Sequence, residues 1–261
     1  MNRPTPASLW PEVAPDWMLN LPEGLENLCY RFYKSLIFDG RYELYFTGLK
    51  NTLLLTLLAL VIGIIIGVIV ALIRVTWDKN GEDMTGASKF VLRIANAICQ
   101  VYLTVIRGTP AVVQAMIMYF VIFASSRNKI MIGALSFGIN SGAYVAEIIR
   151  GGIMSVDAGQ MEAGRSLGFG YVPTMQHIIL PQAFKNVLPT LCNEFIVLLK
   201  ETSVAGYVGV VDLTKAGDII RGRTFSAFMP LIAVALVYLV MVVILTALVR
   251  KLERRLQKSE R

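Results

Sequence analysis

The sequence predicts an all-α polytopic membrane protein, a chain that crosses a bilayer several times as helices. Hydrophobic residues make up 55% of its 261 residues and charged residues only 16%, against about 25% charged in typical soluble domains. Residues 52–73 and 228–249 are two blocks without a single charge. A run of about 18 or more apolar residues indicates a membrane-spanning helix. This pattern excludes a disordered chain and an ordinary soluble globule.

One transmembrane domain is expected over residues 44–250. The apolar segments predict about five spans, at 52–74, 94–124, 130–149, 186–206 and 228–249. The second segment is too long for one perpendicular helix, and Arg107-Gly108-Thr109-Pro110 interrupts it. Proline removes a backbone donor and glycine relaxes the chain, so we expect a kink or break at this point.

Residues 1–43 form an N-terminal extension. Residues 1–22 contain five prolines and no apolar core of a signal peptide, so we expect an irregular, uncleaved segment. Residues 25–37 place apolar side chains at helical spacing. They predict an amphipathic helix that either lies in the membrane interface or packs on another part of the protein.

The C-terminal end predicts the topology. Residues 250–261 carry six basic and two acidic side chains directly after the last span. Because basic residues concentrate on the cytoplasmic side, the tail 251–261 is expected to be cytoplasmic. Five spans then place the N-terminus outside and the long loop 150–185 inside. The net charge of +7 is explained by basic residues on the cytoplasmic side, so we expect no nucleic-acid partner. The lipid bilayer is the expected partner of the apolar spans.

The sequence contains no residue pattern that is typical of a metal site or of a catalytic site. Cys29, Cys99 and Cys192 are far apart, and His177 is the only histidine. No cysteine and histidine spacing fits a metal site, and no nucleophile is paired with a base. We therefore expect no catalytic residue, no metal site and no cofactor bound by this chain.

The long loop predicts two short helices joined by a turn. Asp157 suits an N-cap for a first helix over about 158–167, and Gly168 suits the left-handed residue that ends it. Pro173 fits the first turn of a second helix, and Pro181 is expected to stop that helix. A rigid helical knob of this kind would be presented to a soluble partner.

This loop resembles the EAA loop of the permeases of ATP-binding-cassette (ABC) importers. The family pattern is Glu-Ala-Ala, three residues, Gly, nine residues, then Ile, any residue, Leu and Pro. The chain departs from it only at Gly164, where alanine is usual. The resemblance implies a type I importer permease fold, with these residues coupling to an ATPase: Glu162, Ala163, Gly164, Gly168, Leu180 and Pro181.

Other motifs resemble the polar amino-acid uptake branch of this family. They are Arg107-Gly108-Thr109-Pro110 with Gln114, the segment 140–153, and the segments 193–196 and 200–203. The resemblance covers roughly residues 44–256 and leaves the N-terminal extension unassigned. It implies a permease subunit, not an enzyme, that couples ATPase motion through the loop 157–181 to alternating access for a polar amino acid.

The resemblance also implies the partners. They are cytoplasmic ABC ATPase subunits that hold ATP and Mg²⁺, a second permease chain that is identical or similar, and an extracytoplasmic amino-acid-binding protein, at a bacterial inner membrane. The chain itself has no Gly-Lys dipeptide and so no phosphate-binding loop of the GxxxxGK[ST] type.

Polar side chains inside the expected spans are candidate pathway residues, because such groups are costly in lipid and commonly face a cavity. They are Asn140, Glu147, Asn193 and Glu194. Hydrogen bonding between helices is the alternative role, and a simple ion pair with Arg150 is the favoured alternative for Glu147.

Three other functions compete with this interpretation. An ion-driven secondary amino-acid transporter would normally show internal repeats and more spans. An integral membrane enzyme would need a catalytic cluster at one membrane face. An ABC permease for a solute other than an amino acid would share the same coupling loop.

Overall fold

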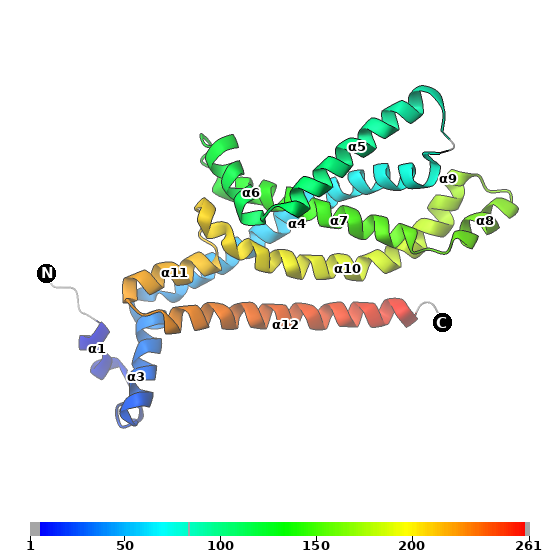
Figure 1. Cartoon of the computed structure of the whole chain (residues 1–261). Coiled ribbons are helices and arrows are strands. Elements are labelled where there is room, and N and C mark those ends of the chain that lie inside the picture. The colour runs from blue at the N-terminus through cyan, green and yellow to red at the C-terminus, as the bar shows by residue number, and fades with distance from the viewer. Residues whose placement is uncertain (1–5, 83, 259–261) are drawn as a thin grey trace.

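The computed structural model describes residues 6–82 and 84–258, and this part of the chain is helical without a β-strand. The helices form an elongated bundle with the N-terminus at one end and the C-terminus at the other (Figure 1). Helices α8 and α9, from the expected coupling loop, lie at the C-terminal end (Figure 1). This end is called the coupling end below.

Long helices build the bundle. They are α4 (Tyr42–Asn80), α5 (Gly86–Gly108), α7 (Lys129–Met154), α10 (Leu180–Glu201) and α12 (Phe228–Lys258). Among the described residues, four helices are long and apolar enough to cross a membrane, namely α4, α5, α7 and α12. Helix α10 has 22 residues, about 33 Å at 1.5 Å per residue, but polar residues such as Asn193 and Glu194 lower its hydropathy. It contains most of the fourth expected span.

Shorter elements complete the chain. They are α1 (Pro6–Val13), α2 (Asp16–Leu19), α3 (Glu23–Phe32), α6 (Ala111–Ile117), α8 (Ala158–Ser166), α9 (Tyr171–Thr174) and α11 (Leu213–Thr224). Single π-helical turns cover Tyr33–Ile37, Met118–Ile122 and Met175–Ile179, and 3₁₀ turns cover Phe38–Gly40 and Thr202–Val208.

The expectation of an irregular segment over residues 1–22 is wrong for its described part, because α1 and α2 lie there. Pro6 is the first residue of α1, and Pro15 and Pro22 are the N-caps of α2 and α3. Proline is tolerated at a helix start, where its missing N–H would have no acceptor in any case. Here Pro6, Pro15 and Pro22 begin helices instead of preventing them, and Pro11 lies inside α1.

The expected break in the second apolar segment is confirmed. Helix α5 ends at Gly108, Thr109 is extended with φ −125° and ψ 147°, and Pro110 is the N-cap of α6. The break turns α6 away from the direction of α5 (Figure 1). It therefore leaves backbone carbonyls near Thr109 open to side-chain donors.

Helices α4 and α7 pack closely along the middle of the bundle. A methyl group added at Gly63 would lie 3.2 Å from Cβ of Ser141, and one at Gly67 would lie 2.5 Å from Cγ1 of Val145. The two glycines thus let the helices approach to a distance that any larger residue would prevent.

Gly67→Ala is expected to lower the stability of the permease domain by about 1–2 kcal/mol, because the new methyl group overpacks a buried contact. Gly151→Ala is the matched control, since no atom lies within 4 Å of a methyl group at that position of α7. Thermal unfolding of both variants in detergent measures the difference. A melting temperature equal to that of the wild-type chain for Gly67→Ala would show that the helices separate easily.

Polar contacts attach the segment after α10 to α4. The Thr56 hydroxyl lies 3.1 Å from that of Thr202, and the Thr52 hydroxyl accepts from the backbone N–H of Leu213 at 3.0 Å. Asn51 donates to the backbone carbonyl of Val211 at 2.9 Å. The motif at 200–203 therefore includes a buried threonine that holds the end of α10 against α4.

Candidate functional site

The coupling loop begins with a capped helix. The Asp157 carboxylate accepts from the backbone N–H of Gly159 at 2.6 Å, as predicted for the N-cap of α8. The helix ends at Ser166 with Leu167 as its C-cap, and Gly168 follows in the left-handed conformation with φ +86°. The N–H of Gly168 donates to the carbonyl of Arg165 at 2.9 Å, and that of Phe169 donates to Gly164 at 3.0 Å. These bonds form a complete Schellman motif, so the turn after α8 is rigid.

The prediction that Pro181 stops the second helix is wrong. The chain is helical without interruption from Tyr171 to Glu201, through α9, one π-helical turn and α10. In that turn the N–H of Leu180 donates to Met175, five residues back. The wider turn places Pro181 in the first turn of α10, where its missing donor costs little. One helical rod therefore connects the coupling loop to the bundle centre.

The surface of this element is exposed and mixed in character. Glu162 and Ala163 are exposed on α8, and the Glu162 carboxylate has no ion pair or hydrogen bond within the described chain. Large apolar side chains are exposed beside them: Leu167 (75%), Phe169 (47%), Val172 (57%) and Phe184 (60%). Leu180 and Pro181 are also exposed. An apolar surface around a free carboxylate is suited to bind a partner protein.

Gly164 faces the other way and is buried against the second helix. A methyl group at Gly164 would lie 2.5 Å from Cγ2 and 2.7 Å from Oγ1 of Thr174, which is fully buried. The departure from the alanine of the family pattern therefore has a structural reason. Glycine accommodates the branched side chain of Thr174 in the packing of α8 on α9.

Gly164→Ala is expected to destabilise the loop by about 1 kcal/mol, since the overpacking cost exceeds the gain in helix propensity. In a Thr174→Ala background the same change is expected to stabilise α8 by a similar amount. Hydrogen exchange of the α8 amides measures both effects. An equal effect of Gly164→Ala in the two backgrounds would contradict the proposed contact.

Gln114 fastens the break between α5 and α6. Its amide nitrogen donates to the carbonyl of Ile106 at 2.8 Å and to the hydroxyl of Thr109 at 2.7 Å. Its amide oxygen accepts from Asn140 of α7 at 3.0 Å. The guanidinium of Arg107 lies 5.7 Å from the ring centre of Tyr144, also on α7. The family-motif residues thus hold the broken helix against α7.

The next residue on α7 makes a second polar contact. The hydroxyl of Ser141 donates to the carboxylate of Glu194 on α10 at 2.9 Å, and both residues are buried. Asn193, by contrast, is exposed and has no side-chain hydrogen bond within the described chain. The structure therefore places Asn140 and Glu194 at one level inside the bundle and leaves the side chain of Asn193 on the exposed side of α10.

Glu147 belongs to a different cluster. It accepts from Arg150 at 3.2 Å, and Arg150 also pairs with Asp78 of α4 at 3.2 Å. These side chains are partly exposed. The geometry supports an ion pair that joins α7 to α4, and it separates Glu147 from the Ser141–Glu194 contact.

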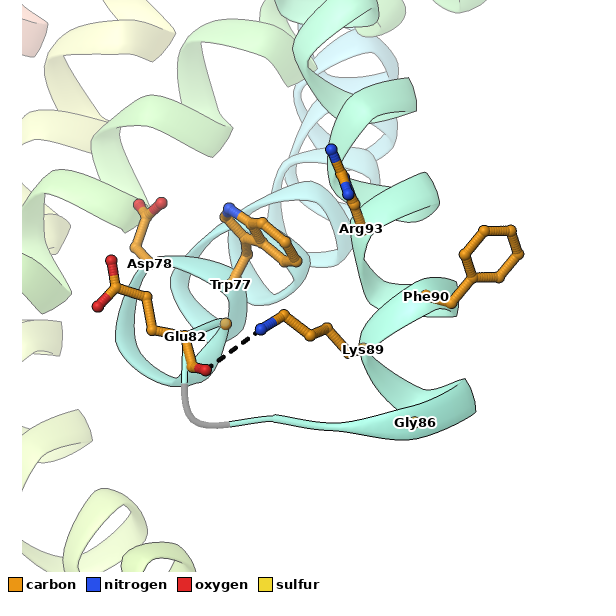
Figure 2. Close-up of a pocket in the computed structure, with 8 residues that line it drawn as sticks. Trp77, Asp78, Glu82, Gly86, Lys89, Phe90 and Arg93 are labelled. Carbon is orange, nitrogen blue, oxygen red and sulfur yellow. Dashed lines mark hydrogen bonds between the residues drawn. The ribbon is translucent and has the colours of Figure 1, made fainter.

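A cavity of about 680 Å³ adjoins this ion pair, between α4 and α5. Figure 2 shows Trp77 between the acidic Asp78 and Glu82 on one side and the basic Lys89 and Arg93 on the other. Lys89 donates to the backbone carbonyl of Glu82 at 3.2 Å. The cavity lies toward the coupling end, where Val75 of α4 packs with Ile179 and with Met161 of α8.

A smaller cavity of about 270 Å³ lies at the break itself. Thr109, Gln114 and Ser136 line it together with apolar side chains. The Ser136 hydroxyl is buried and has no hydrogen-bond partner within the described chain. The surface of this cavity is almost entirely apolar, and its volume lies below the range that is usual for small-molecule sites.

Residues 63–258 match the family described as binding-protein-dependent transport system inner membrane component. The chain belongs to this family. It is 40% identical to the glutamine transport system permease protein GlnP of Escherichia coli over 168 residues, 63% of this chain and 77% of that protein. A GlnP protein of Rickettsia bellii is 40% identical over 158 residues, 59% of this chain and 72% of that protein.

Solved structures agree with this assignment. An amino acid ABC transporter crystallised with histidines is 38% identical and has a TM-score of 0.73, covering 90% of this chain and 99% of that one. The MetNI methionine ABC transporter has a TM-score of 0.69 at 18% identity, covering 84% of this chain and 98% of that one, which supports the fold. The protein is therefore a multi-pass inner-membrane permease with the type I ABC importer fold.

Family membership assigns this permease a transport role and leaves ATP hydrolysis to a separate subunit. The family works with an ATPase and a binding protein. Sequence reasoning singled out neither Ser136 nor Asp78, and it included Ser141 only within the segment 140–153, although each contacts or adjoins a candidate residue. The adjacent Asn140 and Ser141 could have predicted these contacts, because two neighbouring polar side chains on one helix point toward two different helices.

Proposed function

We propose that this permease is the membrane subunit of an ATP-driven importer of polar amino acids. Its α8 and C-terminal tail are assigned to the cytoplasm and its N-terminus to the outside. Two features support this orientation. The basic tail follows α12, and α8 lies at the same end of the bundle as the C-terminus (Figure 1). Both placements agree with the positive-inside rule.

One observation carries the proposal. The exposed α8 sits between α7 and the helical rod 171–201, and these two elements make the buried Ser141–Glu194 contact. A displacement of α8 therefore reaches the centre of the bundle from both sides, through α7 and through the rod. Rigid helices transmit such a displacement without needing a separate pathway of side chains.

The mechanism follows from this connection. Closure of the ATPase subunits on ATP would push α8, and α7 and α10 would rock relative to α4 and α5. Access to the bundle centre would then alternate between the two sides of the membrane. The coupling requires that α8 binds the two ATPase states with different affinity, and Glu162 and the surrounding apolar side chains are the residues placed to do so.

The partners follow from the same proposal. Two ATPase subunits would hold ATP and Mg²⁺ and bind the two coupling loops. A second permease chain, identical or similar, would complete the pathway. An extracytoplasmic binding protein would deliver the substrate. This chain would bind no cofactor of its own.

Substrate contacts are proposed at the level of Asn140 and Glu194. A zwitterionic amino acid needs partners for both its ammonium and its carboxylate. Glu194 supplies a buried carboxyl group for the ammonium, and Gln114 and Asn140 supply amide groups nearby. The relatives named for glutamine transport and the transporter crystallised with histidines support a polar amino acid as the substrate.

The test is uptake of a panel of labelled amino acids by cells with and without this permease, each with and without ATP depletion. Loss of uptake confined to one class (basic, acidic or amide) and dependent on ATP is the expected result. If expressed permease changes uptake of no amino acid in cells that lack a redundant importer, the amino-acid assignment fails. A solute of another kind would then be the cargo.

A further inference from the structure

Residues 6–41, named here the N-terminal layer, form a small folded unit with its own core. Trp10, Ala14 and Tyr33 are buried together. The Trp10 ring lies 5.8 Å from that of Tyr30 and 5.5 Å from that of Tyr33, measured between ring centres. The Trp10 indole also donates to Glu26 at 3.4 Å. The layer is therefore held in one shape, and its outer face is a defined surface.

The layer is attached to the end of the bundle opposite α8. Leu36 packs against a cluster that contains Leu213 of α11 and Val234 of α12. Met229, near the start of α12, lines a groove of about 340 Å³ together with side chains of α1 and α3. In Figure 1, α3 runs transversely to α12 and extends away from the bundle at the start of α12. If α12 spans the membrane, α3 lies parallel to the membrane plane.

The outer face of α3 is apolar although no part of the chain within residues 6–82 and 84–258 covers it. Leu25, Leu28 and Phe32 are 51%, 44% and 48% exposed, and they recur at helical spacing. Further apolar side chains are exposed in the layer and in the first turns of α4 and α12: Val13, Trp17, Ile37, Tyr42, Phe46, Phe228, Leu231 and Ile232. Leu28 and Phe32 line one groove together with Met229, so the apolar face of α3 continues onto the first turn of α12.

We propose that the N-terminal layer lies in the membrane interface of the leaflet opposite the coupling helix. Leu25, Leu28 and Phe32 contact acyl chains there, and Asn27 and Arg31 face water. The orientation of α3, the groove that joins its apolar face to Met229 of α12, and the amphipathic aromatics Trp17 and Tyr42 all fit an interfacial helix.

The charge of the layer decides what drives this contact. Residues 6–41 contain five acidic and three basic side chains, a net charge of −2. Anionic lipids would therefore not attract the layer. Apolar burial drives the contact, so its depth is expected to be independent of anionic lipid and of salt.

The experiment uses spin labels on the full-length permease, assembled with its ATPase subunits in nanodiscs. Cys29, Cys99 and Cys192 are first replaced by alanine. A single cysteine then carries the label at Leu28, with Asn27 as the matched control, because the two are adjacent and both exposed. Phe32 and Arg31 form a second pair. Collision with oxygen reports lipid, and collision with a water-soluble nickel chelate reports water.

Labels at Leu28 and Phe32 are expected to collide several-fold more with oxygen than with the chelate, and labels at Asn27 and Arg31 to show the reverse. The contrast should be the same in phosphatidylcholine alone and in a mixture with phosphatidylglycerol. Equal chelate access at all four positions would overturn the proposal. Protection of Leu28 from both reagents would also overturn it, because a protein partner or second copy would then cover the face.

Discussion

Glu162→Lys is expected to abolish ATP-driven uptake while the permease still inserts into the membrane. Glu162 is exposed on α8 and has no partner within the described chain, so its replacement disturbs no internal contact. Reversal of a charge at a protein interface costs several kcal/mol, which corresponds to a loss of more than about tenfold in binding. Uptake of the labelled substrate and co-purification of the ATPase subunits both measure the effect.

Gln160→Lys is the matched control, because Gln160 is exposed on the same helix and residues two apart do not share a helix face. It adds the same lysine to α8 on another face of the helix and gives up only the long hydrogen bond that Gln182 donates to Gln160, at 3.4 Å. Uptake is expected to stay near the wild-type level. Normal transport by Glu162→Lys, with both variants equally abundant in the membrane, would refute the coupling role of Glu162.

Much of this fold follows from the sequence because a bilayer permits few solutions. A span must be long, apolar and helical, so 52–73 and 228–249 identify α4 and α12 directly. The break at Gly108 to Pro110 and the turn at Gly168 were also predictable, since each depends on the backbone limits of glycine or proline. The coupling helix was predictable from its cap and its spacing, and α8 lies within a residue of the expected bounds.

Other features depend on contacts that a linear pattern does not contain. Pro181 seemed a helix stop because sequence rules assume α-helical hydrogen bonding, and a single π-helical turn satisfies the backbone instead. Gly164 departs from the alanine of the family pattern, and only the structure gives the reason, because the side chain of Thr174 occupies the space beside it. The helices before α3 were missed because prolines that start helices and prolines that punctuate loops look alike in sequence.

The pairing of polar residues was the least predictable feature. Asn140, Glu147, Asn193 and Glu194 were similar candidates by hydropathy alone. The structure separates them, because Glu147 pairs with Arg150, Asn193 is exposed, and Asn140 and Glu194 make contacts inside the bundle. Which neighbour a polar side chain meets depends on helix rotation, and a single sequence does not determine it.

Glu194→Gln is expected to reduce uptake by about tenfold or more while leaving the assembled permease as stable as the wild-type protein. The glutamine carbonyl can still accept from the Ser141 hydroxyl, so the contact between α7 and α10 is kept. The negative charge is lost, and a hydrogen bond to a charged group contributes about 1.5–3 kcal/mol. Transport by the reconstituted complex and its thermal unfolding measure the two effects separately.

Two further variants distinguish a substrate contact from a purely structural one. Glu194→Asp keeps the charge and is expected to retain more uptake than Glu194→Gln, although its shorter side chain weakens the bond to Ser141. Ser141→Ala keeps the carboxylate but removes its donor, and a buried acceptor without a donor costs about 1–3 kcal/mol. It should therefore lower stability more than Glu194→Gln does.

If Glu194→Gln transports normally and Ser141→Ala alone is impaired, the carboxylate joins helices and does not contact the substrate. We expect Glu194→Gln to impair transport more than Ser141→Ala does. A neutral amide would join the two helices equally well, and burying a carboxylate costs more free energy than burying an amide.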